Sequence, residues 1–189
     1  MIKNILLIGV GGQGTILTTK ILAAGLASVG YDVKMSEIHG MSQRGGSVTT
    51  QIRYGEKVYA PTIGIGEADV LVSFEKMEAL RALPFLKQNG QLIMDEREIY
   101  PMPVLTGVAA YPYDAIEQLQ NSGAQVSVVK ATEIAQELGN IRAQNMVLLG
   151  ALVKSLAIEG IDWSGLVAKY VPAKAKELNL QAFAIGYGI

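Results

Sequence analysis

The chain has 189 residues, of which half are apolar and 17% are charged, and it contains no cysteine. Its 16 basic and 17 acidic residues give a formal net charge of -1, which excludes the strongly basic profile of a nucleic-acid-binding protein. The lack of cysteine excludes disulfides, and zinc or iron–sulfur clusters held by cysteine, within this chain. The length predicts a single domain over residues 1–189.

The first apolar segment runs from Ile5 to Val10 and ends at the glycines that follow. It is too short for the apolar core of a secretory leader, and a helix that spans a bilayer takes roughly 20 residues. We therefore expect a cytoplasmic protein without membrane contact.

Residues 5–8 form a continuous apolar run, which is typical of a central parallel strand covered on both faces. Glycines interrupt the pattern over residues 9–14, and residues 15–29 favour a helix that ends at Gly30. Residues 31–35 predict a second strand. Two strands joined by a helix predict a right-handed βαβ unit.

The rest of the chain alternates between short apolar runs and segments with helical periodicity. Residues 47–54 predict a strand, and residues 58–60 are expected to return beside it as a hairpin. Further buried strands are predicted at 68–74, 91–95 and 125–130. Helices are predicted at 75–83, 113–121, 132–138 and 142–158, followed by a helix capped by Asp162 and a final helix after Pro172.

This alternation predicts the fold class, a three-layer α/β/α, Rossmann-like domain with a mainly parallel sheet and an added β-hairpin. In open sheets of this kind, ligands meet the loops at the carboxyl ends of the strands. Two such loops hold the chemistry of this sequence, a glycine-rich turn at residues 9–14 and a polar loop at residues 37–48.

The turn from Gly9 to Gly14 matches the pattern G-x-G-x-x-G between a predicted strand and a predicted helix. Backbone N–H groups in that position approach an anion at the positive end of the helix. Glu37 lies 23 residues after Gly14, close to where dinucleotide-binding domains keep an acidic residue for a ribose hydroxyl. One interpretation is therefore NAD or FAD binding. Another is a tight turn that needs glycine for packing and binds nothing.

The polar loop carries the single histidine of the chain, His39, and an arginine, Arg44. Arg44 is suited to hold an anion through paired hydrogen bonds, with the backbone amides of Gly45 and Gly46 nearby. Alternatively, Arg44 pairs with a local carboxylate and His39 caps the loop. One histidine cannot form a metal site, and we expect none.

Other signatures of catalysis are missing from the sequence. A phosphate-binding P-loop is excluded because Thr15 directly follows the last glycine of the turn, so the required lysine is absent. The sequence also lacks HExxH metal spacing and a G-x-S-x-G nucleophile turn.

Several segments together resemble a known family. GVGGQGTILTTKILA and SEIHGMSQRGGSV are similar to motifs in the gamma-type subunits of 2-oxoacid:ferredoxin oxidoreductases. The form of the second motif is more similar to that of the indolepyruvate-type members. The resemblance covers nearly the whole chain, because it continues through ADVLVSFEKMEALR, NMVLLGAL and ELNLQAF.

The resemblance implies a subunit of a complex that converts an arylpyruvate, such as indolepyruvate, to its acyl-CoA and passes electrons to ferredoxin. In the family, thiamine diphosphate and [4Fe-4S] clusters are held by a large partner subunit, and coenzyme A is a co-substrate. The resemblance further implies that this chain alone binds no cofactor. The absence of cysteine agrees with that division of labour.

The resemblance also directs attention to particular residues. We expect the amides of the glycine-rich turn and Arg44 to form an anion-binding surface, to which polar side chains of the loop contribute. Asn145, within NMVLLGAL, is expected to make a buried structural hydrogen bond, with ligand contact as the alternative. Arg142 is expected either at an interface or in solvent. The expected ligand-binding residues are Gly11, Gly12, Gln13, Gly14, His39, Ser42, Gln43, Arg44, Gly45 and Gly46.

Two other functions remain open at this stage. One is a free-standing oxidoreductase that holds NAD or FAD with the glycine-rich turn and Glu37. The other is a non-catalytic regulatory or assembly module that uses the same loops for contact with a partner.

Overall fold

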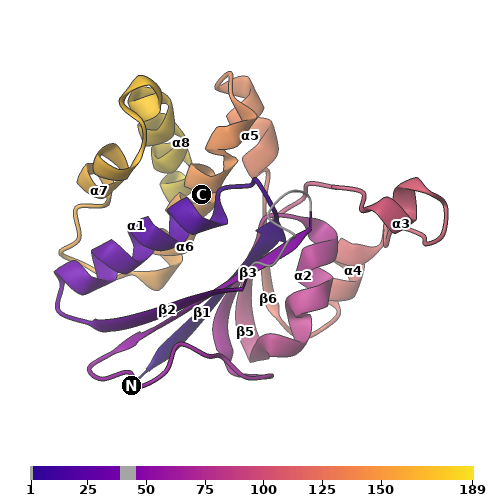
Figure 1. Ribbon diagram of the computed structural model, residues 1–189, viewed down its shortest axis with the longest axis horizontal. Helices are drawn as coiled ribbons and strands as arrows, with labels where there is room; N and C mark the ends of the chain where they lie inside the picture. The colour runs from indigo at the N-terminus through magenta and orange to yellow at the C-terminus, as the bar shows by residue number, and fades with distance from the viewer. Residues whose placement is uncertain (1, 39–45) are drawn as a thin grey trace.

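A computed structural model describes residues 2–38 and 46–189, and it contains one six-stranded sheet with helices on both faces (Figure 1). The strands are β1 (Lys3–Val10), β2 (Asp32–Ile38), β3 (Ser47–Gly55), β4 (Ala68–Ser73), β5 (Leu86–Asp95) and β6 (Gln125–Val129). The helices are α1 (Thr15–Ser28), α2 (Lys76–Ala82), α3 (Met102–Leu105), α4 (Ala115–Gln120), α5 (Ala131–Glu137), α6 (Gln144–Leu156), α7 (Trp163–Tyr170) and α8 (Lys176–Gly188).

The strand order is β2-β3-β1-β4-β5-β6. β1, β4, β5 and β6 pair in parallel, whereas β3 is antiparallel to both of its neighbours, β1 and β2. β2 therefore runs in the same direction as β1, as a βαβ unit requires, but β3 lies between them. The expected fold class, a mainly parallel Rossmann-like sheet with an antiparallel addition, is confirmed.

The hairpin is formed by different strands than the sequence predicted. β3 pairs with β2, and residues 58–60 form no strand. Val58 is buried, and its N–H donates to Oδ2 of Asp32 at 2.9 Å. This segment is therefore bonded to the start of β2 through a side chain, and it does not form a backbone ladder with β3.

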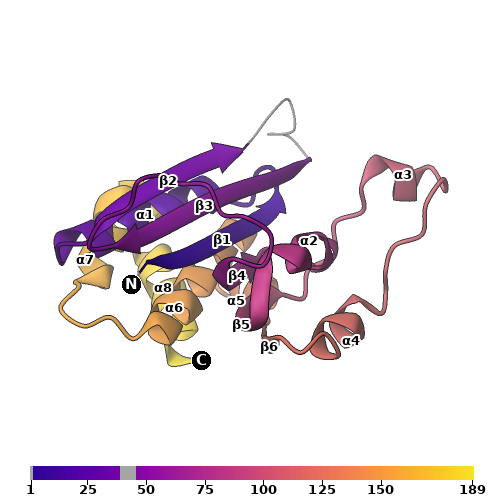
Figure 2. The same cartoon turned by 90° about the horizontal axis from the view of Figure 1, so that it is seen from below.

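Two hydrophobic layers enclose the sheet, as the alternation of side chains along each strand requires. In β1, Ile5 and Leu7 pack with α1, α6 and α8, whereas Leu6 and Ile8 pack with α2 and α4 on the opposite face. Figure 2 shows the sheet and its helices from below. Within residues 2–38 and 46–189, no helix is long and apolar enough to cross a membrane.

α6 and α8 pack very closely because glycines lie at their contact. A Cβ atom built on Gly186 would lie 2.0 Å from the carbonyl oxygen of Val147, and one on Gly150 would lie 2.3 Å from that of Phe183. Both positions therefore bring backbone against backbone. This contact fixes α8 against α6 and so positions the beginning of both helices.

We expect Gly186→Ala to lower the free energy of unfolding by about 1–3 kcal/mol or more, because the added methyl group forces α6 and α8 apart. Urea denaturation measures this effect. Gly188→Ala is the matched control, since a Cβ atom there meets nothing within 4 Å. Equal stability of the two variants would contradict the close-packing explanation.

Asp95, at the end of β5, is a buried carboxylate that holds the start of α5. Its Oδ1 accepts the Thr132 N–H at 3.3 Å, and its Oδ2 accepts the Thr132 hydroxyl. Burial raises the pKa of Asp95 above its usual range, although the hydrogen bonds from Thr132 and the nearby Arg97 oppose this effect. The folded protein therefore binds this proton more tightly than the unfolded chain does.

The raised pKa predicts a loss of stability with rising pH. The contribution is fully present below the unfolded pKa of Asp95 and is lost as the pH rises through its folded pKa. Between about pH 4 and 7, we expect the unfolding free energy to fall more steeply in the wild type than in Asp95→Asn. Asp114→Asn, at an exposed aspartate, is the control. Parallel pH profiles for all three proteins would refute the assignment.

Candidate functional site

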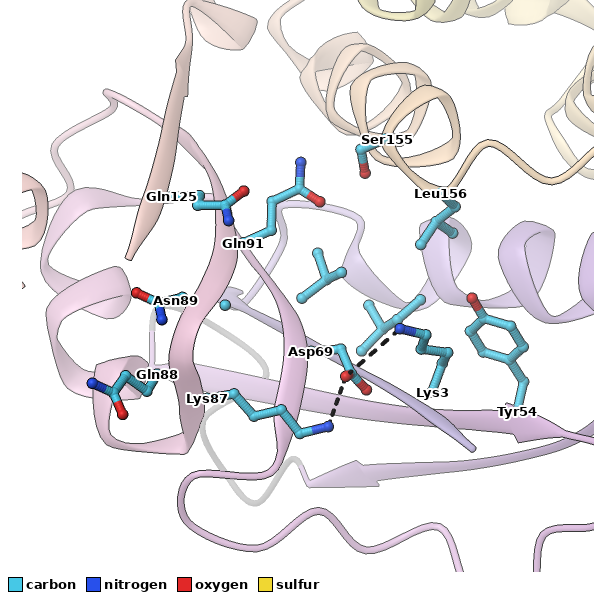
Figure 3. A pocket seen from close by; sticks show the side chains of 13 residues that line it. Lys3, Tyr54, Asp69, Lys87, Gln88, Asn89, Gln91, Gln125, Ser155 and Leu156 are labelled. Atoms are coloured by element: carbon cyan, nitrogen blue, oxygen red, sulfur yellow. Dashed lines mark hydrogen bonds and ion pairs between the residues drawn. The ribbon is translucent and has the colours of Figure 1, made fainter. Parts of the chain in front are cut away.

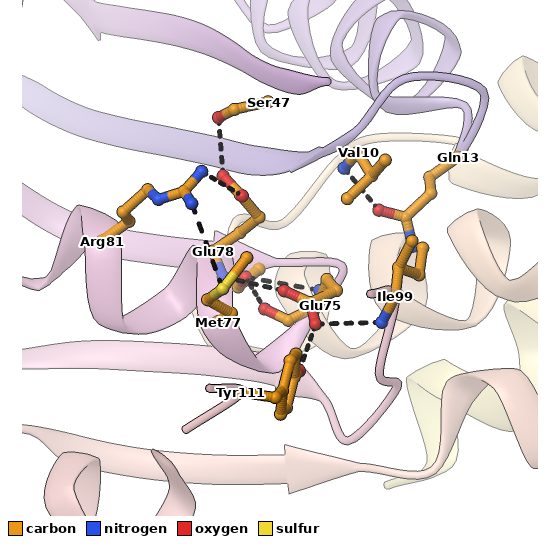
Figure 4. Close-up of polar contacts among 10 residues, drawn as sticks. Val10, Gln13, Ser47, Glu75, Met77, Glu78, Arg81, Ile99 and Tyr111 are labelled. Atoms are coloured by element: carbon orange, nitrogen blue, oxygen red, sulfur yellow. Dashed lines mark hydrogen bonds and ion pairs between the residues drawn. The ribbon is translucent and has the colours of Figure 1, made fainter. Parts of the chain in front are cut away.

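The glycine-rich turn at the carboxyl end of β1 is organised around the side chain of Gln13. Its Oε1 accepts the N–H of Val10 at 2.6 Å, and its Nε2 donates to the carbonyl oxygen of Phe74 at 2.7 Å (Figure 4). The residue is only 6% exposed. Gln13 is one of the expected ligand contacts, and in the structure its side chain joins β1 to the segment that follows β4.

The backbone conformation of the turn requires glycine at two positions. Gly12 and Gly14 have φ angles of 97° and 83°, in the left-handed region that side chains disfavour. A Cβ atom on Gly14 would also lie 2.4 Å from Nδ2 of Asn145. The expected tight turn that needs glycine for packing is therefore present.

The polar loop ends beside this turn. The Gly11 N–H donates to the carbonyl oxygen of Gly46 at 2.9 Å, and Val10 pairs with Ser47 across β1 and β3. The Gly11 amide and the Gly46 carbonyl are thus bonded to each other. The predicted ligand contacts at His39, Ser42, Gln43, Arg44 and Gly45 lie outside the described residues.

Asn145, in the first turn of α6, contacts the glycine-rich turn directly. Its Nδ2 donates to the carbonyl oxygen of Gly14 at 3.3 Å, which confirms the expected structural hydrogen bond. The residue is only 4% exposed, yet its Oδ1 has no hydrogen-bond partner among the described residues. A buried amide oxygen without a partner is costly and is satisfied by a donor from water or a ligand.

A pocket of about 290 Å³ opens where the glycine-rich turn meets the beginnings of α6 and α8. Gly12, Gly14, Arg142, Asn145 and Lys174 line it, together with apolar side chains. Among the described residues, the lining includes two cationic side chains and no aspartate or glutamate. No side chain caps the start of α1, and its first turn holds no acidic residue. The pocket therefore favours an anion.

The structure brings some of the predicted residues together and separates others. Arg142 and Asn145, 128 and 131 residues beyond Gly14, lie at the same pocket as the turn. Glu37 does not, because it lies on β2 and pairs with Thr50 of β3, two strands away from β1. The geometry of a dinucleotide site, with the acidic residue on the strand next to β1, is therefore absent.

Lys174, which no sequence motif predicted at the site, lies in a short helical turn at Ala173–Ala175 before α8 and lines the pocket. Nothing in its local sequence distinguishes it from a solvated lysine. Its place at the pocket follows from the packing of α8 on α6, which no local pattern encodes.

A second cavity of about 380 Å³ lies at the opposite end of the sheet, where the strands begin (Figure 3). Lys87 and Lys3 approach Oδ1 of Asp69 at 2.7 and 4.0 Å, and the Asn4 N–H donates to the other oxygen of that carboxylate. The two lysines at this cavity thus share one carboxylate, which offsets part of their charge. Open α/β sheets bind ligands at the carboxyl ends of the strands, which favours the pocket beside the glycine-rich turn.

A buried carboxylate, Glu75, lies next to Phe74 and organises the neighbouring layer (Figure 4). Its Oε2 caps α2 by accepting the Glu78 N–H at 2.8 Å. Its Oε1 accepts the Ile99 N–H at 3.1 Å and the hydroxyl of Tyr111. Burial, and then the hydrogen bond to Glu75, raise the pKa of Tyr111, so this hydroxyl is a permanent donor.

Glu78 is also buried and links α2 to β3. It accepts hydrogen bonds from the Ser47 hydroxyl at 2.6 Å and from Arg81 at 2.8 Å. Burial raises the pKa of Glu78, while these two partners oppose the shift. The start of β3, where the polar loop ends, is thereby attached to α2.

The donor set of this chain does not suit a redox cofactor held by cysteine or a clustered metal site. The sequence has no cysteine for an iron–sulfur cluster. Within the described ranges, no three histidine, aspartate or glutamate side chains gather in a way that could hold a metal ion.

Comparison with known proteins identifies relatives across the whole chain. The family described as pyruvate ferredoxin/flavodoxin oxidoreductase matches residues 4–189. The indolepyruvate oxidoreductase subunit IorB of Thermococcus kodakarensis is 38% identical over 190 aligned residues, which cover 97% of this chain and 93% of that protein. The common gamma subunit of pyruvate/ketoisovalerate oxidoreductases of Thermococcus litoralis is 27% identical, with coverage of 82% and 78%.

Solved structures share the fold. The gamma subunit of a keto/oxoacid ferredoxin oxidoreductase from Geobacter sulfurreducens has a TM-score of 0.73 at 23% identity, covering 100% of this chain and 95% of that one. A 2-oxoglutarate:ferredoxin oxidoreductase from Magnetococcus marinus, solved with 2-oxoglutarate, coenzyme A and succinyl-CoA, has a TM-score of 0.76 at 22% identity. The match covers 99% of this chain but 30% of that longer one. The chain belongs to the pyruvate ferredoxin/flavodoxin oxidoreductase family and is a subunit of a 2-oxoacid:ferredoxin oxidoreductase.

Proposed function

We infer that this chain is the small subunit of a cytoplasmic complex that oxidises indolepyruvate or a related arylpyruvate. The observation that supports this most strongly is its 38% identity to an indolepyruvate oxidoreductase subunit over 97% of the chain. In the reaction, the bond to the carboxylate breaks and releases carbon dioxide, and the acyl carbon forms a thioester with coenzyme A. Two electrons pass to two oxidised ferredoxins, and a proton is released.

The composition of the chain supports a division of labour within the complex. Without cysteine it cannot ligate [4Fe-4S] clusters, so these belong to a large partner subunit, together with thiamine diphosphate. The partner supplies the decarboxylation and electron-transfer chemistry. This chain supplies binding and orientation.

The ligand proposed for the pocket beside the glycine-rich turn is coenzyme A. Arg142, Lys174 and the first turn of α1 favour its phosphate groups, and no acidic side chain in the described lining repels them. Coenzyme A also carries amide N–H groups and hydroxyls, which can donate to the unpartnered Oδ1 of Asn145. In this proposal, the loop adds further contacts from His39, Ser42, Gln43, Arg44 and Gly45.

We expect Arg142→Ala and Lys174→Ala each to raise the KM for coenzyme A about ten- to a hundredfold, since each removes a charged contact worth roughly 1.5–3 kcal/mol. The kcat is expected to change little, because neither residue contacts the reacting atoms in this proposal. Ferredoxin-linked turnover of the assembled complex gives both constants.

The control for these variants is Lys20→Ala, which removes an exposed cation on α1 that does not line the pocket. A KM for coenzyme A that stays at the wild-type value in both Arg142→Ala and Lys174→Ala would show that the phosphates bind elsewhere. An equal rise in the KM for the 2-oxoacid would point to disturbed assembly.

Co-expression with the large subunit tests the function itself. We expect the two chains to co-purify and to reduce ferredoxin faster with aryl 2-oxoacids than with branched or simple ones. Rates over a panel of aryl, branched and simple 2-oxoacids measure this preference. Full activity of the large subunit alone, or a preference for pyruvate, would contradict the proposal.

A further inference from the structure

The proposed function leaves one prominent segment unused, the arm, which we define as residues 99–113. Both views show α3 at the end of a long excursion, well away from the sheet and the other helices (Figures 1 and 2). The arm has the sequence IYPMPVLTGVAAYPY, which contains no charged residue, although 17% of the whole chain is charged. A surface segment of this length without any charge is unusual, because Lys, Arg, Asp and Glu side chains lie mostly at protein surfaces.

The exposed side chains of the arm are large and apolar. Met102 is 67% exposed, Leu105 63%, Val108 82% and Tyr113 69%. Exposed apolar residues that lie singly need no explanation, but a contiguous group of them marks an interaction site. These residues lie on a projecting element and therefore present a convex surface to a partner.

The arm is ordered before it meets a partner. The carbonyl oxygen of Pro103 accepts the N–H groups of Val108 at 2.8 Å and Ala109 at 3.0 Å, which closes the tip on itself. Glu75 holds both ends of the arm by accepting the Ile99 N–H and the Tyr111 hydroxyl. A segment that is already ordered loses little conformational entropy on binding.

Charge complementarity identifies the kind of partner. An uncharged convex arm fits an apolar cleft that also lacks charge. Two cavities on this chain carry Arg142 and Lys174, or Lys3, Asp69 and Lys87, and two others carry Glu56 and Glu159, or Lys154. None of these four therefore suits an uncharged arm from a second copy. Contact between two convex tips would also fall short of the roughly 800 Å² per partner that a stable interface buries.

We propose that the arm docks this chain into an apolar, uncharged cleft on the large thiamine- and cluster-bearing subunit. This inference rests on the proposed function, which supplies that partner. Glu75, at the base of the arm, follows Phe74, whose carbonyl oxygen is bonded to Gln13 of the glycine-rich turn. A docked arm therefore holds the cationic pocket at a fixed position relative to the partner.

The test compares binding of the purified large subunit to the wild type, to the double variant Leu105→Asp/Val108→Asp, and to Ile65→Asp. Ile65 is 77% exposed and lies at the other end of the sheet, so it is a matched control for an added surface charge. We expect the double variant to bind at least about a hundredfold more weakly, because both charges would enter the apolar cleft. Ile65→Asp should bind as the wild type does, and thermal melts establish that all three chains fold.

Each outcome decides between the two proposals. Wild-type affinity in the double variant would overturn the role of the arm and leave the proposed function intact. Failure of the wild type to bind the large subunit would overturn both. Self-association of the wild type in sedimentation experiments, abolished in the double variant, would assign the arm to a second copy and also overturn the proposal.

The lack of cysteine allows an independent readout. Val108→Cys and Ile65→Cys each introduce the only thiol of the chain, at positions that are 82% and 77% exposed. We expect the large subunit to slow maleimide labelling of Cys at position 108 at least about tenfold and to leave position 65 unaffected. Equal labelling rates in the complex would show that the arm stays in solvent.

Discussion

The amide side chain of Gln13 is the contact on which the rest of this site depends. β1 and β4 are parallel neighbours. Their carboxyl ends must separate, because β1 is followed by α1 and β4 is followed by α2. Gln13 bridges the opening by bonding Val10 on one side and Phe74 on the other. Gly9 makes room for this bridge, since a Cβ atom there would lie 2.8 Å from Oε1 of Gln13. The start of α1, and with it the anion pocket, is held in place by two hydrogen bonds in a dry environment.

Local patterns predicted most of the fold because the helices and the central strands have unambiguous periodicity. The strand at 68–74, the helix at 15–29 and the cap at Asp162 were all confirmed, the last by a 2.9 Å bond from the Gly165 N–H. The partners of β3 were not predictable, because an alternating strand fits either neighbour equally well and the pairing depends on long-range packing. The candidate site was likewise predictable only in part. The glycine-rich turn and Asn145 can be recognised as motifs, whereas the positions of Lys174 and of the Gln13 side chain depend on tertiary contacts.

The pocket combines three elements that are remote in sequence, the starts of α1, α6 and α8. Helix starts carry partial positive charge, and two cations add to it without an acidic side chain to offset them. Such an arrangement is unfavourable in isolation, because like charges repel and Oδ1 of Asn145 lacks a donor. The close glycine contacts between α6 and α8 hold this arrangement together. Rigid packing in the core thus maintains an electrostatically unsatisfied site, as is common where a protein binds a charged molecule.

The position of β3 has a consequence for how the chain folds during synthesis. β2 has one neighbour in the sheet, and that neighbour is β3, which is made after it. A nascent chain that ends before Ser47 can form β1 and α1, but its second strand has nothing to pair with. Once β3 emerges, it can pair with β1 and β2 in one step, because it fills the gap between them. The N-terminal quarter of the chain is therefore not an independent folding unit, and its strands become stable together.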